Sequence, residues 1–444
     1  MKKNVLIIGG GISGLCVLHE LKEKYKNRSD VDVKLFEKSD FVGGTIKTQS
    51  DGEYLFEAGP NGFLGNQPAT FELIKQLGLE GELILAHAQA NKRFVCWDSK
   101  LYLFPTDHFS FFTFGLLSVS DKLRILSEFF IPKGVEEGET IYDFAKRRFG
   151  IKAAQFIFDP VLCGIYAGDI KQLNVSATLP RIFELEQKHG SIIKGMMASR
   201  KKLSQLYSFK KGMGQLIDAL HRRYAAHIHT QQEALKINYL KYQYVVDTLR
   251  ARYQADELFL CLPAYSAQKI TAGLSRVLSE QLCQISYAPV AVVGLVYRQL
   301  SFIKKFDGFG YLRSSLENKN ILGVLFENNV FEGRCPTDQV LIRVMMAGAH
   351  HPFTVGRSAN ELIAMAQEEM ARVFGLSGNL VKTFFSVWPQ AIPQYTMEYV
   401  ERKQKILKEC GQFPHLHLVA NYLDGVSFND CVRNAKLAVE KIKI

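Results

Sequence analysis

The sequence of 444 residues lacks the cysteine spacing of disulfide-rich and zinc-binding proteins. Its 8 cysteines include no CxxC pair, and the two that lie closest in the chain, Cys410 and Cys431, are 21 positions apart. Neither a disulfide framework nor a zinc site is therefore expected. Three histidine pairs have no carboxylate at ligand spacing, so we interpret them as surface or satisfied residues and predict no metal site. These pairs are His227/His229, His350/His351 and His415/His417.

Long hydrophobic runs are also missing. The uncharged stretch 109–120 has only 12 residues, whereas a membrane-spanning helix needs about 20. The longer stretch 281–297 contains Pro289 and several polar residues, and it is typical of a buried strand. The chain starts with MKKNVLIIGGG, which leaves no room for the apolar segment of a signal peptide. We expect a cytoplasmic protein without a transmembrane helix.

Acidic residues are in the minority, with 44 Asp and Glu against 55 Lys and Arg, and the net charge is +11. The positive charges are spread along the chain as pairs and triplets, without the dense run or motif that RNA or DNA binding would suggest. Attraction to an anionic membrane face or to an acidic substrate fits this distribution better than nucleic-acid binding.

The first forty residues carry a dinucleotide-binding fingerprint. Gly9, Gly11 and Gly14 form GxGxxG directly after the apolar run 5–8, and a helical pattern follows. The first glycine permits a tight turn, the second lets a pyrophosphate approach the backbone, and the third lets helix and strand pack closely. A second strand pattern ends at Glu37, where a carboxylate can hydrogen-bond a ribose hydroxyl. The pattern predicts an adenine dinucleotide; a coincidental glycine turn is the alternative.

The continuation favours FAD over NAD. Directly after Glu37 the chain reads KSDFVGGTIKT, and FEAGPNGF follows at 56–63, so that Gly43–Gly44 and Gly59–Asn61 offer further close approaches to the backbone. An NAD-binding domain would normally go on to a plain helix. This stretch resembles the flavin-containing amine oxidase superfamily, in which these glycines line the FAD. Taken alone, GGT can also be an ordinary turn.

The rest of the chain mixes helical and strand patterns. We expect a hairpin at 92–105 with Asp98–Ser99 in its turn, Phe-rich helices from 105 to 205, and a glycine-started helix at 211–220. Between 265 and 385, apolar strands alternate with a helix at 359–374, which is an α+β pattern. No internal repeat is present.

Three later segments are distinctive: CGIYAGDIKQLNVSATLPRIFELEQKHGSIIKG at 163–195, VWPQAIPQYTMEYVER at 387–402 and LVANYLDGVSFNDCV at 418–432. They resemble one particular family, the FAD-dependent protoporphyrinogen oxidases and the closely similar coproporphyrinogen oxidases. The resemblance implies an α/β fold with a discontinuous Rossmann-like FAD domain (1–75, 205–264 and 386–444). It also implies a mixed-sheet α+β substrate domain (76–104 and 265–385) and a helical, membrane-facing domain (105–204).

The same resemblance implies the residues of the site. Those expected on FAD are Gly9, Gly10, Gly11, Ile12, Ser13, Gly14, Glu37, Lys38, Gly44, Thr45, Gly59, Pro60, Asn61, Ala234, Trp388, Gly425, Val426, Ser427 and Phe428. Asn61 is also the candidate catalytic residue, orienting a pyrrole nitrogen or a proton-carrying water, with a turn role after Gly-Pro as the alternative. The candidate substrate residues are Arg93, Tyr102, Gly164, Ala167 and Gly168. In the plant-type members that this hairpin resembles, an arginine occupies the position of Tyr102 and would meet a propionate. Arg93 and Lys100 are therefore the substitute anchors for a propionate in this chain.

The implied activity belongs to heme biosynthesis. The family removes hydrogen from a porphyrinogen in successive two-electron steps, with FAD as acceptor and with oxygen reoxidising it to give hydrogen peroxide. Such a reaction depends on orientation more than on acid–base groups, which fits the absence of a Ser/His/Asp order and of HExxH. Protoporphyrinogen IX is the expected substrate and coproporphyrinogen III the alternative. More distant alternatives are an amine or carotenoid oxidase, or a flavin-free protein like the GDP-dissociation inhibitors.

The resemblance also suggests partners beyond the substrate and oxygen. The Phe-rich stretch 109–130 is either a helical core or a peripheral membrane contact, flanked by Lys122 and Arg124. A homodimer, or contact with the next enzyme of the heme pathway, is a further expectation.

Overall fold

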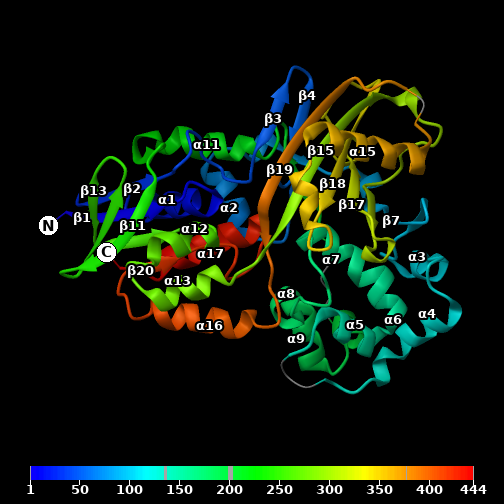
Figure 1. Ribbon diagram of the computed structural model, residues 1–444, viewed down its shortest axis with the longest axis horizontal. Helices are drawn as coiled ribbons and strands as arrows, with labels where there is room; N and C mark the ends of the chain where they lie inside the picture. Colours follow the sequence, from blue (N-terminus) through cyan, green and yellow to red (C-terminus); the bar gives the residue numbers. More distant parts are fainter. Residues whose placement is uncertain (1, 135–137, 199–203, 377, 444) are drawn as a thin grey trace.

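The computed structural model describes residues 2–134, 138–198, 204–376 and 378–443 (Figure 1). One end of the molecule holds a parallel sheet of five strands in the order β10-β2-β1-β14-β20. The strands are β10 (Ile228–His229), β2 (Val31–Phe36), β1 (Lys3–Ile8), β14 (Glu257–Leu260) and β20 (Leu416–Leu418). The sheet therefore joins segments that are hundreds of positions apart in the chain.

Both faces of this sheet are covered, as is usual for parallel sheets. One face packs against α1 (Ile12–Lys24), α11 (Gly214–Tyr224) and α17 (Phe428–Glu440), together with α2 (Pro68–Gln76). The other face packs against α12 (Ala264–Thr271), α13 (Arg276–Cys283), α16 (Tyr399–Cys410) and a small antiparallel sheet. That small sheet contains β11 (Ala234–Leu240), β12 (Gln243–Thr248) and β13 (Arg252–Ala255).

The other end holds a mixed sheet of seven strands in the order β19-β15-β18-β17-β16-β7-β8 (Figure 1). The strands are β19 (Lys382–Pro393), β15 (Tyr287–Arg298), β18 (Gln339–Ala347), β17 (Ile321–Phe326), β16 (Gly310–Arg313), β7 (Arg93–Trp97) and β8 (Lys100–Leu103). β7 pairs with β16 in parallel and the other pairs are antiparallel. The predicted helix at 359–374 is α15 (Ala359–Phe374), and it covers one face of the sheet.

The predicted hairpin at 92–105 is confirmed as β7 and β8. Asp98 and Ser99 form its two-residue turn with positive φ angles of 49° and 57°, which is the geometry that matches the twist of the flanking strands. One predicted domain boundary, at residue 386, falls inside β19, which pairs with β15 along its length. The division into three domains stays a prediction.

Short helices fill the segment from 105 to 198. They are α3 (His108–Thr113), α4 (Val119–Leu126), α5 (Ile141–Phe149), α6 (Ile151–Ala153), α7 (Asp159–Tyr166), α8 (Val175–Thr178), α9 (Pro180–His189) and α10 (Ile192–Ala198), with a π-helical turn (Ala154–Phe158) before α7. A buried ion pair between Arg148 and Glu128 holds this segment together, and Glu128 also accepts from the Ser191 hydroxyl at 2.5 Å. Within the described part of the chain, no helix has both the length and the apolar character that spanning a membrane requires.

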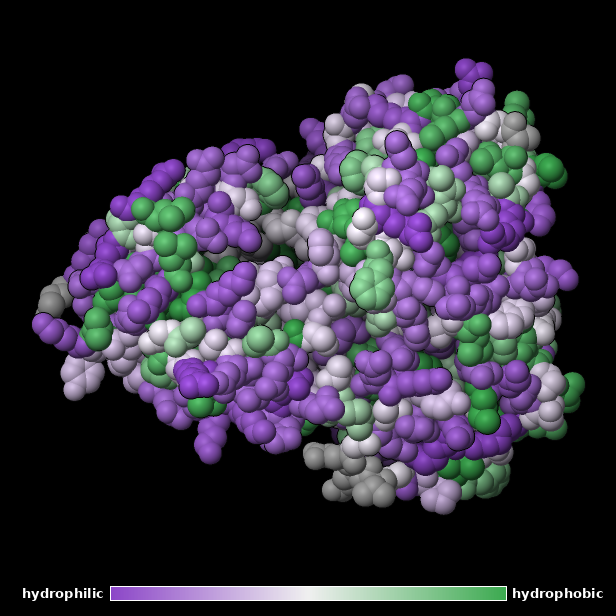
Figure 2. All heavy atoms as spheres, in the orientation of Figure 1, coloured by the Kyte–Doolittle hydropathy of each residue, from purple (hydrophilic) through white to green (hydrophobic). Residues whose placement is uncertain are grey.

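Short strands connect the two ends of the molecule. They are β3 (Thr48–Asp51), β4 (Tyr54–Glu57), β5 (Phe63–Leu64), β6 (Leu83–Leu85) and β9 (Leu206–Phe209), and a further helix, α14 (Glu327–Val330), follows β17. The loop between β4 and β5 holds residues 58–62 and lies between the two large sheets, because it contacts both Thr45 and Arg343. Figure 2 shows the surface hollowed between the part that holds the parallel sheet and the part that holds the mixed sheet.

Candidate active site

The turn between β1 and α1 is built to receive an anionic group. A Cβ on Gly14 would lie 1.9 Å from the carbonyl oxygen of Gly9, so only glycine allows the helix this close to the turn. A Cβ on Gly11 would meet no heavy atom of the described residues within 4 Å, so this side of the turn is open. Helix α1 begins directly after Gly11, and within the described chain no side chain caps it. Uncapped amides beside open space suit a pyrophosphate.

Glu37 stands at the carboxyl end of β2, beside this turn. Its Oε2 accepts from the Gly10 amide at 2.7 Å, and its Oε1 accepts from the Ser39 amide at 2.9 Å. A carboxylate has about four lone-pair sites, so acceptor capacity remains for ribose hydroxyls. Lys38, which follows, is exposed. The segment before Ala234 lies against this corner, since the Gln232 amide donates to the Glu37 carbonyl at 2.8 Å.

Two further glycine loops come together with the first turn. The Gly43 amide donates to the Gly10 carbonyl at 2.8 Å, and a Cβ on Gly44 would lie 3.3 Å from the Cα of Gly11. A Cβ on Gly59 would lie 1.8 Å from the carbonyl oxygen of Thr45. The loops 9–14, 43–45 and 58–61 therefore form one continuous wall. Trp388 of β19 joins this wall, because its indole Nε1 donates to the Ala58 carbonyl at 2.8 Å.

Asn61, which follows Pro60 in this wall, has a buried side-chain nitrogen. Its Nδ2 makes no hydrogen bond with any described residue. A buried donor without a partner costs about 1–3 kcal/mol, and such a group in a native fold usually serves a ligand or water. This property favours the functional interpretation of Asn61 over the turn interpretation.

The stretch before α17 lies beside the turn at the start of the chain. α1 and α17 pack side by side, and Ser13 in the first turn of α1 lies beside the Cys431 thiol in the first turn of α17. Both helices therefore present their N-termini to the same region. Ile12 begins α1 and Phe428 begins α17.

Some backbone donors near the N-terminus of α17 already have hydrogen-bond partners within the protein. The Gly425 amide donates to the Tyr395 hydroxyl at 2.9 Å, and Ser427 caps α17 through a reciprocal pair of hydrogen bonds with Asp430. The amides of Val426 and Phe428 stay as the candidates for cofactor contact. Of the four residues expected on FAD here, Gly425 and Ser427 already have a partner for their backbone amide, and a glycine turn in the sequence does not reveal which donors are satisfied.

The predicted substrate residues fall into two groups. Gly164 and Ala167 of α7 and the adjoining turn pack against protein: a Cβ on Gly164 would lie 2.5 Å from Leu312 of β16, and the Ala167 carbonyl accepts from the Ala349 amide at 2.7 Å. Gly168 is equally tight, since a Cβ there would lie 2.5 Å from the Gln394 side chain. These small residues let α7 approach the mixed sheet closely.

Arg93 and Tyr102 lie on β7 and β8, at the edge of the mixed sheet opposite β19. Five strand spacings of about 4.8 Å separate β7 from β19, which is about 24 Å along the sheet. Arg93 lies over the Phe309 ring at 5.1 Å, and Tyr102 packs in an apolar cluster with Phe114. The structure does not bring these two residues to Trp388, and the propionate anchor stays a prediction.

A cluster of buried charges behind the loop 58–61 was not anticipated from the sequence. Arg343 of β18 donates through Nη2 to the Gly59 carbonyl, and its Nη1 lies 3.9 Å from the Glu327 carboxylate. Arg334 is buried beside them and donates to the Ser208 hydroxyl at 3.0 Å. The only sequence signal was a cation within the apolar strand QVLIRVMMA.

Glu57 completes this cluster. It accepts from the Met213 amide at 2.7 Å and from the Thr48 hydroxyl at 2.8 Å. Burial raises the pKa of Glu57 to about 6, and repulsion from Glu327 acts in the same direction. Burial also lowers the pKa of Arg343. The loop that carries Asn61 is therefore supported by a cluster of buried charged side chains.

Comparisons with known proteins show which family and which solved structures the chain is similar to. A spinach (Spinacia oleracea) protein named protoporphyrinogen oxidase 1, chloroplastic, is 29% identical over 97% of this chain and 82% of its own length. A Bacillus subtilis protein named coproporphyrinogen III oxidase is 26% identical over 99% and 97%. A crystal structure from Exiguobacterium sp. 255-15, provisionally named protoporphyrinogen oxidase, superposes with a TM-score of 0.87 at 23% identity over 99% and 98% of the two chains. The family model of flavin-containing amine oxidoreductases matches residues 12–443. The chain belongs to the family of flavin-containing amine oxidoreductases.

Proposed function

We propose that this protein oxidises protoporphyrinogen IX to protoporphyrin IX in heme biosynthesis, with FAD as its cofactor. The observation that carries the proposal is the wall formed by the loops 9–14, 43–45 and 58–61, with the unpartnered amide of Asn61 in it. The family supplies the flavin, and relatives named for porphyrinogen oxidation match nearly the whole chain.

The residues of the wall fit FAD. The amides at the start of α1 would face the pyrophosphate, and the remaining lone pairs of Glu37 would accept from the adenosine ribose. Trp388 and the residues 59–61 would line the flavin end. Bound FAD supplies a hydride acceptor, which the side chains themselves lack.

The protein's own part in the reaction is orientation. Asn61 can donate from Nδ2 and accept at Oδ1, so it can hold a pyrrole N–H, or a water that carries the released proton, in one position. Arg343 fixes the loop by its bond to the Gly59 carbonyl. Positioning of this kind speeds the reaction, because it lowers the entropy cost of bringing the reacting groups together.

The proposal extends to molecular oxygen as the terminal acceptor and to a membrane surface as a peripheral partner. Exposed apolar side chains on and after α3 and α4 support the membrane contact: Phe109, Phe112, Leu123 and Phe130. These helices lie at the rim of the molecule (Figure 1). We further propose a cytoplasmic location, and a homodimer or a contact with the next heme-pathway enzyme.

The test is to purify the protein, record its flavin absorption, and follow porphyrin fluorescence and hydrogen peroxide with each of two porphyrinogens. We expect bound flavin and faster turnover of protoporphyrinogen IX than of coproporphyrinogen III. Faster turnover of coproporphyrinogen III would assign the alternative substrate. Bound flavin without porphyrin formation would point to another flavin oxidase, and a purified protein that binds no FAD would contradict the proposal.

An Asn61→Ala variant examines the proposed orienting role. We expect flavin content close to that of the wild type and turnover lower by about 10- to 100-fold, the effect of losing one positioning contact. Asn91→Ala, a change at an exposed asparagine outside the wall, serves as the control. Equal turnover in Asn61→Ala and the wild type would leave Asn61 as a turn residue.

A further inference from the structure

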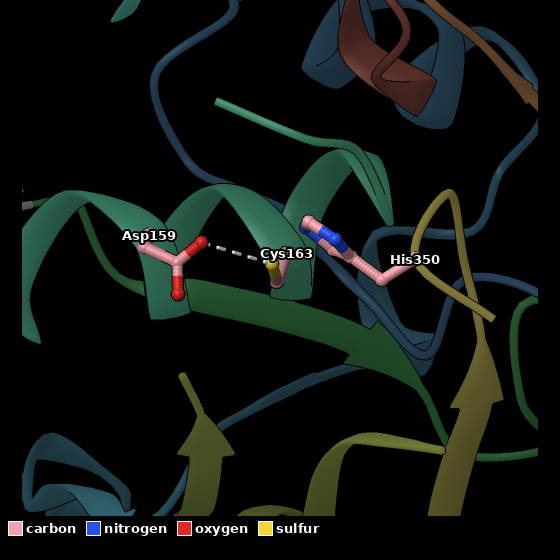
Figure 3. A group of neighbouring side chains, drawn as sticks. All are labelled: Asp159, Cys163 and His350. Carbon is pink, nitrogen blue, oxygen red and sulfur yellow. Dashed lines mark hydrogen bonds between the residues drawn. The ribbon is translucent and has the colours of Figure 1, made fainter. Parts of the chain in front are cut away.

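We propose that Asp159, Cys163 and His350 form a binding site for one divalent cation of the zinc class. One ligand atom from each of these residues lies within 4.8 Å of the other two (Figure 3). Asp159 and Cys163 are four positions apart on α7, so they lie on the same face of the helix. His350 reaches them from the turn after β18. This group could not be predicted from the sequence, because its third member is nearly two hundred positions away and belongs to a histidine pair that we interpreted as surface or satisfied residues.

The spacing of the first two ligands already suits a tetrahedral ion. Asp159 Oδ1 and Cys163 Sγ are 3.6 Å apart. Zinc binds oxygen at about 2.0 Å and sulfur at about 2.3 Å, so two such ligands at a tetrahedral angle are about 3.5 Å apart. An ion between them therefore requires little movement of α7.

Neighbouring residues hold the ligands in place. Asp159 accepts from the Ser314 hydroxyl at 2.9 Å and from the Ser315 amide at 2.7 Å, which fixes its carboxylate. The turn that carries His350 is tied to α7, since the Ala349 amide donates to the Ala167 carbonyl at 2.7 Å. Hydrogen bonds to the far side of ligands are the usual support of metal sites.

The site is reachable and leaves room for a further ligand. It borders a shallow depression that Arg313, Lys319, His350 and His351 line together with Cys163. The His350 side chain is 28% exposed, and its Nε2 lies 3.9 Å from Asp169 Oδ1. A water can take the remaining position from the depression.

Nitrogen, oxygen and sulfur ligands in one group favour Zn²⁺ or Co²⁺ over Mg²⁺ and Ca²⁺, which prefer oxygen alone. The positive charge of Arg313 beside the site is offset by Glu369 at 2.7 Å and by Glu317. Lys319 remains as the cation that faces the depression, and Asp169 as the further anion.

The experiment is a titration of the full-length, flavin-loaded protein with Co²⁺, followed by thiolate-to-cobalt absorption, and with Zn²⁺, followed by calorimetry. We expect one equivalent to bind, and affinity at least tenfold lower in His350→Ala and in Cys163→Ser. His351→Ala is the matched control for the neighbouring histidine, and Cys283→Ser the control for an exposed thiol. Both controls should bind as the wild type does.

Several outcomes would overturn the proposal. The wild type could bind no cation in a saturable manner, or Cys163→Ser could keep full affinity. Loss of binding in Cys283→Ser would assign the cation to that surface thiol instead. Because His350 is at the surface, His350→Ala is expected to fold, and unchanged affinity in that variant would be decisive against the site.

Discussion

Among single residues, Glu37 has two roles. It holds the turn by accepting from Gly10 and Ser39, and in the proposed function it also accepts from the ribose. We predict that Glu37→Gln keeps the fold and weakens FAD binding by about 1.5–3 kcal/mol, the worth of a hydrogen bond to a charged group. Fluorescence of released flavin on dilution measures this, with the exposed Asp40→Asn as control. Equal release from both variants would contradict the ribose contact.

Arg343 is the second residue whose loss should be costly. Arg343→Met leaves the Glu327 carboxylate, which is buried, with a weaker cation environment. Breaking a buried pair costs about 3–5 kcal/mol, and we expect the low end because Arg334 lies close by. Urea unfolding of Arg343→Met and of the double variant Arg343→Met/Glu327→Gln measures this. The double variant should recover part of the loss; if it is no more stable than the single variant, the two charges are not coupled.

Some residues of the proposed site could be predicted from the sequence, and others could not. Glycine spacing followed by Glu37 is a local pattern, so the first turn was predictable from about thirty residues. Arg343 lies on β18, its partners come from β4, from the loop 58–62 and from α14, and only tertiary packing brings them together. Asn61 was predictable as a candidate, whereas its unpartnered nitrogen was not.

At the scale of elements, the start of α17 depends on Gly425. This residue has a φ of +104°, and a Cβ on it would lie 2.4 Å from the Asp430 carboxylate, which takes part in the cap of α17. We predict that Gly425→Val disrupts the cap, at about 1 kcal/mol for the cap alone and more with the backbone strain. Flavin content should fall with it. Thermal unfolding and flavin stoichiometry test this, with Asp430→Asn as the variant that weakens the cap without a clash.

A Gly425→Val protein with wild-type melting temperature and flavin content would show that this turn is not part of the site. Its position near α1 would then be a matter of packing alone.

Helices α3 and α4 present an apolar surface whose composition differs from the simplest interpretation of the sequence. Phe114 is 1% exposed and belongs to the core, whereas Phe109 is 76% and Phe130 87% exposed. The cations thought to flank a membrane contact are used internally: Lys122 donates to the Phe112 carbonyl at 2.7 Å, and Arg124 to the Arg147 carbonyl at 2.6 Å. Periodicity alone did not show which phenylalanines face outward.

We therefore predict that changing four exposed side chains to serine reduces binding to lipid vesicles by at least tenfold without loss of flavin. The four are Phe109, Phe112, Leu123 and Phe130. Partial burial of these side chains supplies the binding energy. Vesicle co-sedimentation measures it, and a second variant, Leu300→Ser/Ile303→Ser, changes exposed apolar residues elsewhere. Equal vesicle binding by wild type and the fourfold variant would end the membrane proposal.

At the scale of the whole molecule, buried Glu57 makes stability depend on pH. Its pKa in the folded protein is about 6, above the ordinary value of 4.5. The folded state thus holds the proton more tightly, and stability from this group is full below about pH 4.5 and lost as pH rises through 6. Relative to pH 7, we expect about 1 kcal/mol more stability at pH 5 and about 2 kcal/mol near pH 4.

Urea unfolding of the wild type and of Glu57→Gln at these pH values isolates the contribution of this residue. The difference between the two proteins should change with pH in that direction. A difference that is constant from pH 4 to pH 7 would mean that burial does not raise the pKa of Glu57.

The overall architecture was more predictable from the sequence than the pairing of its strands. Alternating elements and one fingerprint indicated a Rossmann-like part and a mixed-sheet part, and the family comparison agrees. The strand orders of the two sheets were not predictable, because pairing between β14 and β20, or between β7 and β16, depends on segments far apart in the chain. For the same reason the strand β19 was divided at residue 386, where the structure has it continuous.

The parallel sheet joins β1 to β20, and α1 to α17, across more than 400 residues. A ribosome adds about 5–20 residues per second, so the N-termini of α1 and α17, which both belong to the proposed FAD site, are made roughly 20–80 s apart. Throughout that time α1 lacks its neighbour α17, and β14 has an unpaired edge from its own synthesis until β20 is made. Open strand edges promote aggregation. The proposed site therefore predicts that FAD is loaded only after synthesis has passed residue 440, and that the yield of holoprotein depends on how well the cell protects the unfinished chain.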